Sequence, residues 1–152
     1  MEVKNYLLGY DNMYIMQDTD LFNFSLDSVL LPNFVTINPS MKKILDIGCG
    51  GGKNIERFAK QISENGRVVG IDYSEVSVEK STKLNQEFID QGIVNVLQVS
   101  VSEMPFYDET FDIVTGFETI YFWPDFINDL KEVNRVLKKD GLVFFCNEAV
   151  YR

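Results

Sequence analysis

The sequence predicts an α/β fold in which a parallel sheet is flanked by helices. Two observations lead to this class: from residue 43 onward short apolar runs alternate with amphipathic stretches, and a cluster of glycines follows the first run. Strands separated by single helices form right-handed βαβ units, which place the strands parallel in one sheet. We expect five strands, arranged across the sheet in the order 3-2-1-4-5.

The first strand and helix are indicated at residues 44–47 and 53–64. Residues 44–47 are a short apolar run that ends in glycines, which favours a buried strand. The next stretch has apolar residues at i, i+3, i+4 and i+7, the spacing of an amphipathic helix, and Asn65-Gly66 is a suitable end for it. These apolar residues are Ile55, Phe58, Ala59 and Ile62.

The second and third strands are expected at residues 67–72 and 95–100, with one helix between them. Ser74 is a suitable N-cap for that helix, which we expect to continue to about residue 91, with Gly92 after it. Its apolar face is thin and consists of Val78, Leu84, Phe88 and Ile89.

The last two strands are expected at residues 111–117 and 142–147, and residues 101–110 are expected to form a loop. Pro124 suits the first turn of the helix between these strands, and Asp140-Gly141 predicts a turn before the fifth strand. The apolar positions of this helix are Phe126, Leu130, Val133 and Leu137.

The composition excludes several kinds of site. The chain has no histidine, which removes Ser-His-Asp and Cys-His nucleophilic sites and histidine-ligated zinc. Its net charge of -9 disfavours broad contact with a phosphate backbone. Its two cysteines are too few for a disulfide framework, and we find no signal peptide and no apolar run long enough to span a bilayer. These features predict a cytoplasmic protein, and no metal is expected.

The glycine cluster carries the strongest functional signal. Asp46, Gly48, Gly50 and Gly52 form a D-x-G-x-G-x-G pattern between an expected strand and an expected helix, as a nucleotide-binding turn requires. Glycines let the backbone approach a ligand closely, and the helix start offers free N–H groups. Asp72 closes the next strand, where a carboxylate can accept both hydroxyls of a ribose.

The alternative of a dinucleotide site fits less well. That site requires G-x-G-x-x-G, and its third glycine would fall on Lys53. The D-x-G-x-G-x-G pattern instead resembles motif I of the class I S-adenosylmethionine-dependent methyltransferases, which have a Rossmann-like fold. Residues 104–114 (MPFYDETFDIV) and 132–141 (EVNRVLKKDG) are similar to stretches of the ubiquinone/menaquinone-type enzymes that act on small molecules. These matches together cover about residues 44–148.

The resemblance implies a cofactor, S-adenosyl-L-methionine, and roles for particular residues. Asp46 would orient the glycine loop and the amino-acid part of the cofactor, Asp72 would hold the ribose, and Tyr73 would lie against the adenine. Ser100 stands where the family often has an aspartate for the adenine, so the backbone of Val101 is the alternative contact. The full expected set is Asp46, Gly48, Cys49, Gly50, Gly52, Asp72, Tyr73, Ser100, Val101 and Phe117, with Glu118 as candidate general base.

Residues 1–42 give a different indication and are expected to form a cap or lid before the cofactor-binding domain at residues 43–152. They resemble the N-terminus of bacterial tRNA adenine-N6 methyltransferases that act on a valine tRNA. Those enzymes carry an Asn/Asp-Pro-Pro-Tyr motif after the fourth strand, where this chain has residues 116–119, Gly-Phe-Glu-Thr. We therefore expect a small-molecule acceptor, with the tRNA adenine as the alternative.

The chain ends where the fifth expected strand ends. Complete class I enzymes have two further strands, so either the chain is truncated or something else covers this edge. An open parallel edge invites pairing. We therefore expect self-association through residues 142–147, unless residues 1–42 cover them. A module that binds the cofactor without catalysis is a further alternative.

Overall fold

The computed structural model describes residues 2–6, 14–18, 37 and 39–147. The chain divides into two compact units, residues 1–34 and residues 35–152. In the first unit, β1 (Glu2–Tyr6) pairs antiparallel with β2 (Tyr14–Asp18), and Glu2 lies opposite Asp18. This ribbon was not predicted, because two strands of five residues give too short a pattern for periodicity to reveal. Of the expected cap, residues 1, 7–13, 19–36 and 38 lie outside the described residues.

The second unit is built on a five-stranded sheet with the order β5-β4-β3-β6-β7. Every neighbouring pair of strands is parallel. In chain order this is the arrangement 3-2-1-4-5, so the predicted α/β fold is confirmed. The strands are β3 (Lys43–Ile47), β4 (Arg67–Asp72), β5 (Val94–Gln98), β6 (Phe111–Phe117) and β7 (Leu137–Cys146).

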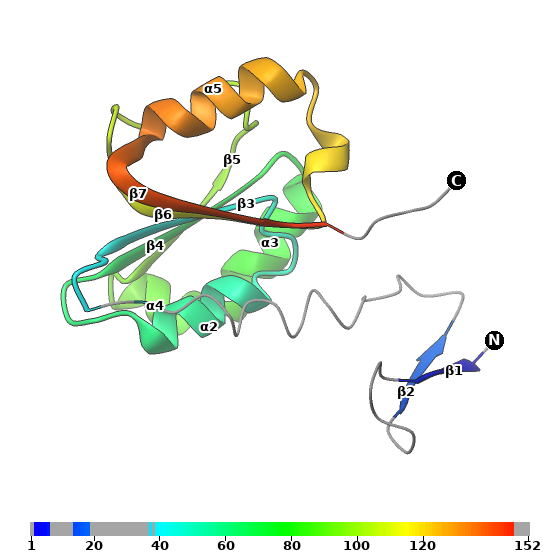
Figure 1. The fold of residues 1–152 in the computed structure, drawn as a ribbon. Helices are drawn as coiled ribbons and strands as arrows, with labels where there is room; N and C mark the ends of the chain where they lie inside the picture. Colours follow the sequence, from blue (N-terminus) through cyan, green and yellow to red (C-terminus); the bar gives the residue numbers. More distant parts are fainter. Residues whose placement is uncertain (1, 7–13, 19–36, 38, 148–152) are drawn as a thin grey trace. The chain divides into compact units, whose positions relative to one another are not determined.

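The helices cover both faces of this sheet. Figure 1 shows α5 on one face and α2, α3 and α4 on the other. A short 3-10 helix, η2, follows β6. The bounds are α2 (Lys53–Gln61), α3 (Glu75–Leu84), α4 (Gln86–Asp90), η2 (Ile120–Phe122) and α5 (Phe126–Val136).

The core lies where the central strands meet the helices. Leu45 and Val114 are fully buried and belong to a cluster that includes Val133 and Val136 of α5. On the other side of β3, Ile44 is fully buried, as are Ile55 and Phe58 of α2. Burial of both faces explains why β3 and β6 read as continuous apolar runs and not as alternating strands.

The predicted helix from Ser74 to residue 91 is wrong in one respect, because the structure breaks it at Asn85 into α3 and α4. Its buried residues are also not the predicted apolar ones. Ser81 and Asn85 are fully buried, whereas Leu84 is exposed. A hydrophobicity pattern places polar residues on the solvent face, so it could not identify a helix that buries an amide and a hydroxyl.

Two other helices have boundaries that differ from the predicted ones. The helix after β3 ends at Gln61, and Ile62 already has an extended backbone. The last helix begins at Phe126, with the Asp125 side chain accepting from the N–H of Asn128, so Pro124 precedes the helix and does not lie in its first turn. Aspartate is a strong N-cap, because its carboxylate satisfies an N–H that the helix leaves unpaired.

The turn expected at Asp140-Gly141 lies inside a continuous strand, β7. The pairing is irregular here: Leu137 lies opposite Phe111, whereas Leu142 lies opposite Ile113. Asp112 stands between these positions, and its Oδ1 lies 2.6 Å from Lys138 Nζ. Leu142 and Val143 are exposed on this strand, and self-association through it remains a prediction.

One arginine connects α5 to the loop after β5. Arg135 donates to the carbonyl oxygens of Met104 (3.0 Å) and Phe106 (2.7 Å), and to both carboxylate oxygens of Glu132 (2.7 and 2.8 Å). Glu132 in turn accepts from the N–H of Met104 at 2.9 Å. The Glu-x-x-Arg pair of the sequence resemblance therefore holds the loop between β5 and β6 against α5.

Candidate functional site

The loop between β3 and α2 has the backbone shape that the glycine pattern requires. Gly48, Gly50 and Gly52 have φ of +67°, +51° and +80°, a left-handed conformation that other residues resist. The N–H groups of Gly48 and Cys49 both donate to the carbonyl oxygen of Ile71, at 2.8 and 3.0 Å. The loop is therefore tied to the end of the neighbouring strand β4.

Gly48 is also closely approached from the side of β6. A Cβ on Gly48 would overlap the hydroxyl of Thr119, a residue that is itself buried. Gly50 and Gly51, in contrast, have open space where a Cβ would lie. The loop therefore packs against Thr119 at Gly48, whereas Gly50 and Gly51 leave space that a ligand can occupy.

Asp72 ends β4 beside this loop. Its Oδ2 accepts from the N–H of Gly50 and its Oδ1 from the N–H of Ser74, both at 2.9 Å. A carboxylate oxygen has two acceptor positions, so both oxygens keep capacity for ligand hydroxyls. Tyr73, the next residue, is 67% exposed and has a ring free to stack against a planar ligand.

Asp46 is the acid of the site whose pKa departs furthest from its ordinary value. It is buried, and its Oδ1 accepts from the Thr115 hydroxyl at 2.8 Å, whereas its Oδ2 has no partner among the described residues. Burial raises the pKa of Asp46 to about 7; the nearby Asp72 charge adds to the rise, and the Thr115 hydrogen bond opposes it. A buried, unpaired carboxylate oxygen suits a cationic ligand group such as an ammonium.

The raised pKa makes the stability of the protein depend on pH. In the folded protein the pKa of Asp46 is about 7, so it keeps its proton to about that pH, whereas the unfolded chain releases it near the ordinary aspartate pKa of 3.8. Because the folded state then binds more protons, this group lowers the free energy of unfolding as pH rises between these values, by about 1.4 kcal/mol per pKa unit.

The variant Asp46→Asn should remove this loss, since the amide does not titrate and its oxygen can still accept from Thr115. Urea unfolding at pH 5 and pH 7.5 checks the expectation. The wild type should lose more stability than Asp46→Asn between the two pH values. Equal pH dependence in both proteins would show that Asp46 is ionised throughout.

Two of the residues expected near the adenine, Ser100 and Val101, lie after β5. Ser100 is exposed, and its hydroxyl accepts from the N–H of Ser102 at 3.2 Å. The Val101 side chain is buried in the core cluster, so Val101 offers a ligand only its backbone. Phe117 ends β6 and is buried, with its ring 6.0 Å from that of Phe144.

Glu118 and Cys49, the two remaining expected residues, lie in different environments. Glu118 has a left-handed backbone, with φ of +53°, and its N–H donates to the carbonyl oxygen of Cys146 at 2.8 Å. This places it at the carboxyl end of the sheet, where open α/β folds bind ligands. Cys49 is buried, and burial raises the pKa of its thiol, so it is a packing group and not a nucleophile.

Four residues that were not predicted contact this loop or Asp46. Thr115 holds Asp46, Thr119 packs on Gly48, and Ser81 and Asn85 pack on Gly52. All four are buried and polar. A single sequence carries no signal for them, because polar residues are expected at the surface until the fold shows otherwise.

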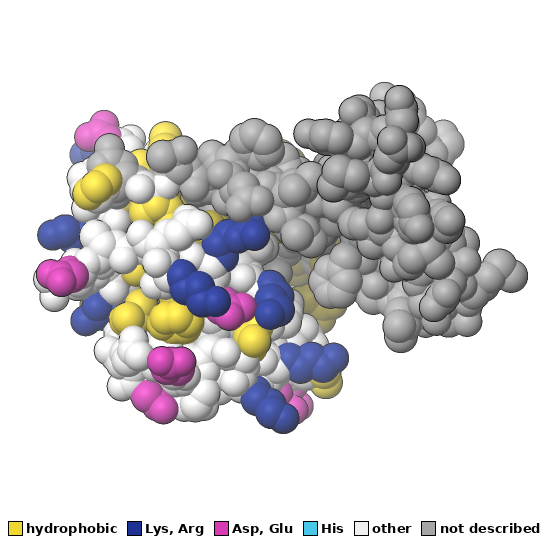
Figure 2. All heavy atoms as spheres, turned by 90° about the horizontal axis from the view of Figure 1, so that it is seen from below, with side chains coloured by type: hydrophobic (Ala, Val, Ile, Leu, Met, Phe, Trp, Pro, Cys, Tyr) yellow, Lys and Arg dark blue, Asp and Glu magenta, His cyan; other side chains and the backbone are white. Residues whose placement is uncertain are grey.

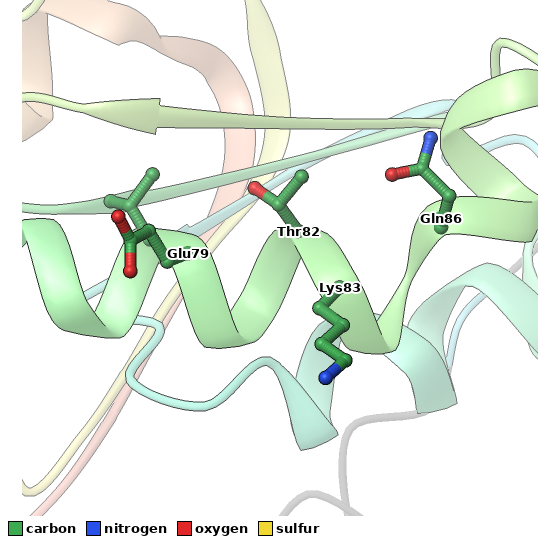
Figure 3. A pocket seen from close by; sticks show the side chains of 5 residues that line it. Glu79, Thr82, Lys83 and Gln86 are labelled. Atoms are coloured by element: carbon green, nitrogen blue, oxygen red, sulfur yellow. The ribbon is translucent and has the colours of Figure 1, made fainter.

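The described surface has a further hollow away from the glycine loop. It runs along α3 and is lined by Val78, Glu79, Thr82, Lys83 and Gln86 (Figure 3). Its lining includes no residue of the glycine loop, so it is separate from the site above. Among the described residues, no three Cys, Asp or Glu side chains are grouped as a metal site.

The donor groups of the glycine site fit S-adenosylmethionine. The unpaired Oδ2 of Asp46 suits its ammonium group, the open side of Gly50 leaves room for its chain, and Asp72 can accept its ribose hydroxyls. These assignments of individual contacts remain predictions.

Known proteins are similar to this chain in sequence and in fold. Residues 45–145 match the methyltransferase domain family. A demethylmenaquinone methyltransferase of Bacillus cereus is 37% identical over 101 residues, which are 66% of this chain and 42% of that enzyme. The chain thus spans less than half the length of this relative.

Two solved structures are similar over most of the chain. The YcgJ protein from Bacillus has a TM-score of 0.67 and 27% identity, and the match covers 78% of this chain and 49% of that one. A SAM-dependent methyltransferase from Aquifex aeolicus has a TM-score of 0.64 and 25% identity, covering 74% and 58%. The glycine loop, the strand order and these similarities together show that the chain belongs to the class I S-adenosylmethionine-dependent methyltransferases.

Proposed function

We propose that the protein transfers a methyl group from S-adenosylmethionine to a small, planar, quinol-like acceptor. The observation that carries the acceptor class is a group of aromatic side chains at the carboxyl end of β6. Tyr121 and Phe122 of η2 are 54% and 63% exposed, and η2 begins two residues after Glu118. Exposed aromatic rings beside a ligand site suit a flat, apolar molecule. The similarity to a demethylmenaquinone methyltransferase supports the same class.

The protein would contribute to this reaction mainly by aligning the acceptor with the cofactor. When bound, S-adenosylmethionine supplies a methyl group that its sulfonium already activates. Asp46, the glycine loop and Asp72 would fix the cofactor, and η2 would hold the acceptor ring in line with it. Glu118 is the proposed general base, which would take the proton that the acceptor releases.

The tRNA alternative has less support. Figure 2 shows Lys and Arg side chains on the face formed by α2, α3 and α4, with acidic side chains among them. These helices carry five basic residues (Lys53, Arg57, Lys60, Lys80 and Lys83) and five acidic ones (Glu56, Glu75, Glu79, Glu87 and Asp90). A face without net positive charge gains little from a phosphate backbone.

No described helix is both long and apolar enough to cross a membrane. The identity of the acceptor is tested directly by a methylation assay. The purified protein is incubated with labelled S-adenosylmethionine and either a short-chain demethylmenaquinol or unmodified valine tRNA. We expect label in the quinol alone. Label in the tRNA would favour the tRNA enzyme. Label in neither acceptor, with the cofactor bound, would favour the non-catalytic module.

The variant Glu118→Gln tests the base within the same assay. Its turnover of the quinol should fall about 100-fold, the usual scale of general base catalysis. Its affinity for S-adenosylmethionine should not change, because the amide keeps the size of the side chain. Unchanged turnover would show that the acceptor needs no base or uses another one.

A further inference from the structure

The glycine loop is supported from behind by α3. Asn85, the residue after the last one of α3, is 0% exposed. Its Nδ2 donates to the carbonyl oxygen of Ser81 at 2.9 Å and to the carbonyl oxygen of Gly52 at 3.1 Å. The second bond joins residues 33 positions apart and ends on the last glycine of the loop. Buried N–H groups are costly to leave unpaired, so these bonds of Nδ2 hold both segments in place, whereas Asn85 Oδ1 has no partner among the described residues.

The carbonyl of Gly52 has a second role. It also accepts from the N–H of Glu56 at 3.0 Å, the first hydrogen bond of α2, and Gly52 is the N-cap of that helix. The position of this carbonyl therefore sets where α2 begins and where its unpaired N–H groups point. A Cβ on Gly52 would overlap Ser81 Oγ and lie 2.6 Å from Asn85 Nδ2, so the side chains of Ser81 and Asn85 pack directly against Gly52.

The break between α3 and α4 coincides with this contact. Asn85 has φ of -102° and ψ of 14°, outside the helical range, and serves as the C-cap of α3 and the N-cap of α4. Its own N–H still bonds to the carbonyl oxygen of Ser81 at 3.0 Å. The helix therefore changes conformation at the residue whose side chain reaches the loop.

We propose that Asn85 is a positioning residue for S-adenosylmethionine. It holds the Gly52 carbonyl, and through it the glycine loop, in the conformation that receives the amino-acid end of the cofactor. Asn85 acts through Gly52 and does not touch the ligand. A loop that is ordered before binding loses less conformational freedom when the ligand arrives, which raises affinity. The inference rests on the cofactor of the family and not on the proposed acceptor.

The test uses Asn85→Ser in the full chain. A serine hydroxyl at this position can bond back to the carbonyl of Ser81, but it is too short to reach Gly52. Serine is also a good N-cap for α4, so this variant is designed to fold, and Asn85→Thr is the second variant. Calorimetry with S-adenosylmethionine should show a dissociation constant raised about tenfold, the scale of one lost hydrogen bond.

Two comparisons separate positioning from general loss of stability. Asp129 of α5 is another buried polar residue, away from the loop; its Oδ2 accepts from the N–H of Asp125, the N-cap of that helix. Asp129→Ala should lower the urea midpoint but leave the dissociation constant within twofold. In addition, Gly52→Ala and Asn85→Ser should act less than multiplicatively on affinity when combined, because both act on the same loop conformation.

Equal weakening by Asp129→Ala and Asn85→Ser would overturn the inference, as would fully multiplicative effects with Gly52→Ala. An unchanged dissociation constant in Asn85→Ser would do the same. Failure of the proposed acceptor leaves these measurements intact, because they require only cofactor binding by the wild type.

Discussion

Gly48→Ala is expected to weaken S-adenosylmethionine binding by about 100-fold. The new methyl group would overlap the hydroxyl of Thr119, and the backbone at φ of +67° is strained for any residue with a Cβ. The left-handed backbone costs about 1–2 kcal/mol and overpacking about 1–3 kcal/mol, and a loop that moves to relieve this strain has to regain it when the cofactor binds. Calorimetry with the cofactor measures it.

The matched control is Gly92→Ala. Gly92 has the same left-handed backbone, with φ of +71°, but open space where a Cβ would lie, and it follows α4. This variant should lose stability with little change in affinity. The double variant Gly48→Ala/Thr119→Ala should recover part of the binding, because it removes the overlapping hydroxyl. If Gly48→Ala binds the cofactor like the wild type, the loop does not form the cofactor site.

Asp72→Ala should weaken S-adenosylmethionine binding by about 10- to 100-fold. Charged hydrogen bonds contribute about 1.5–3 kcal/mol, and this carboxylate also holds the N–H groups of Gly50 and Ser74. The variant therefore loses both the proposed ribose contact and an anchor of the loop. Calorimetry of the wild type and the variant gives the size of the combined effect.

An analogue of the cofactor that lacks the ribose 2′-hydroxyl separates the two losses. The wild type should bind this analogue more weakly than S-adenosylmethionine, whereas Asp72→Ala should bind both alike. If the variant still discriminates between them, or if its affinity equals that of the wild type, the ribose is held elsewhere and Asp72 serves only the loop.

The sequence by itself determined the class of the fold and the identity of the loop. Short apolar runs identify β3 and β6 because both faces of these strands are buried. The D-x-G-x-G-x-G pattern identifies the loop because a left-handed backbone at Gly48, Gly50 and Gly52 selects for the absence of a Cβ. Both signals are local, so they can be read from neighbouring residues alone.

Only the tertiary structure decided what surrounds that loop. Asn85 and Thr119 lie far from it in sequence, and as polar residues they read as solvent-exposed. The fold buries them against Gly52 and Gly48 because a backbone without Cβ atoms leaves space that another segment fills. The break of the helix at Asn85 has the same origin: its side chain bonds to a carbonyl of the loop, a contact that no local pattern encodes.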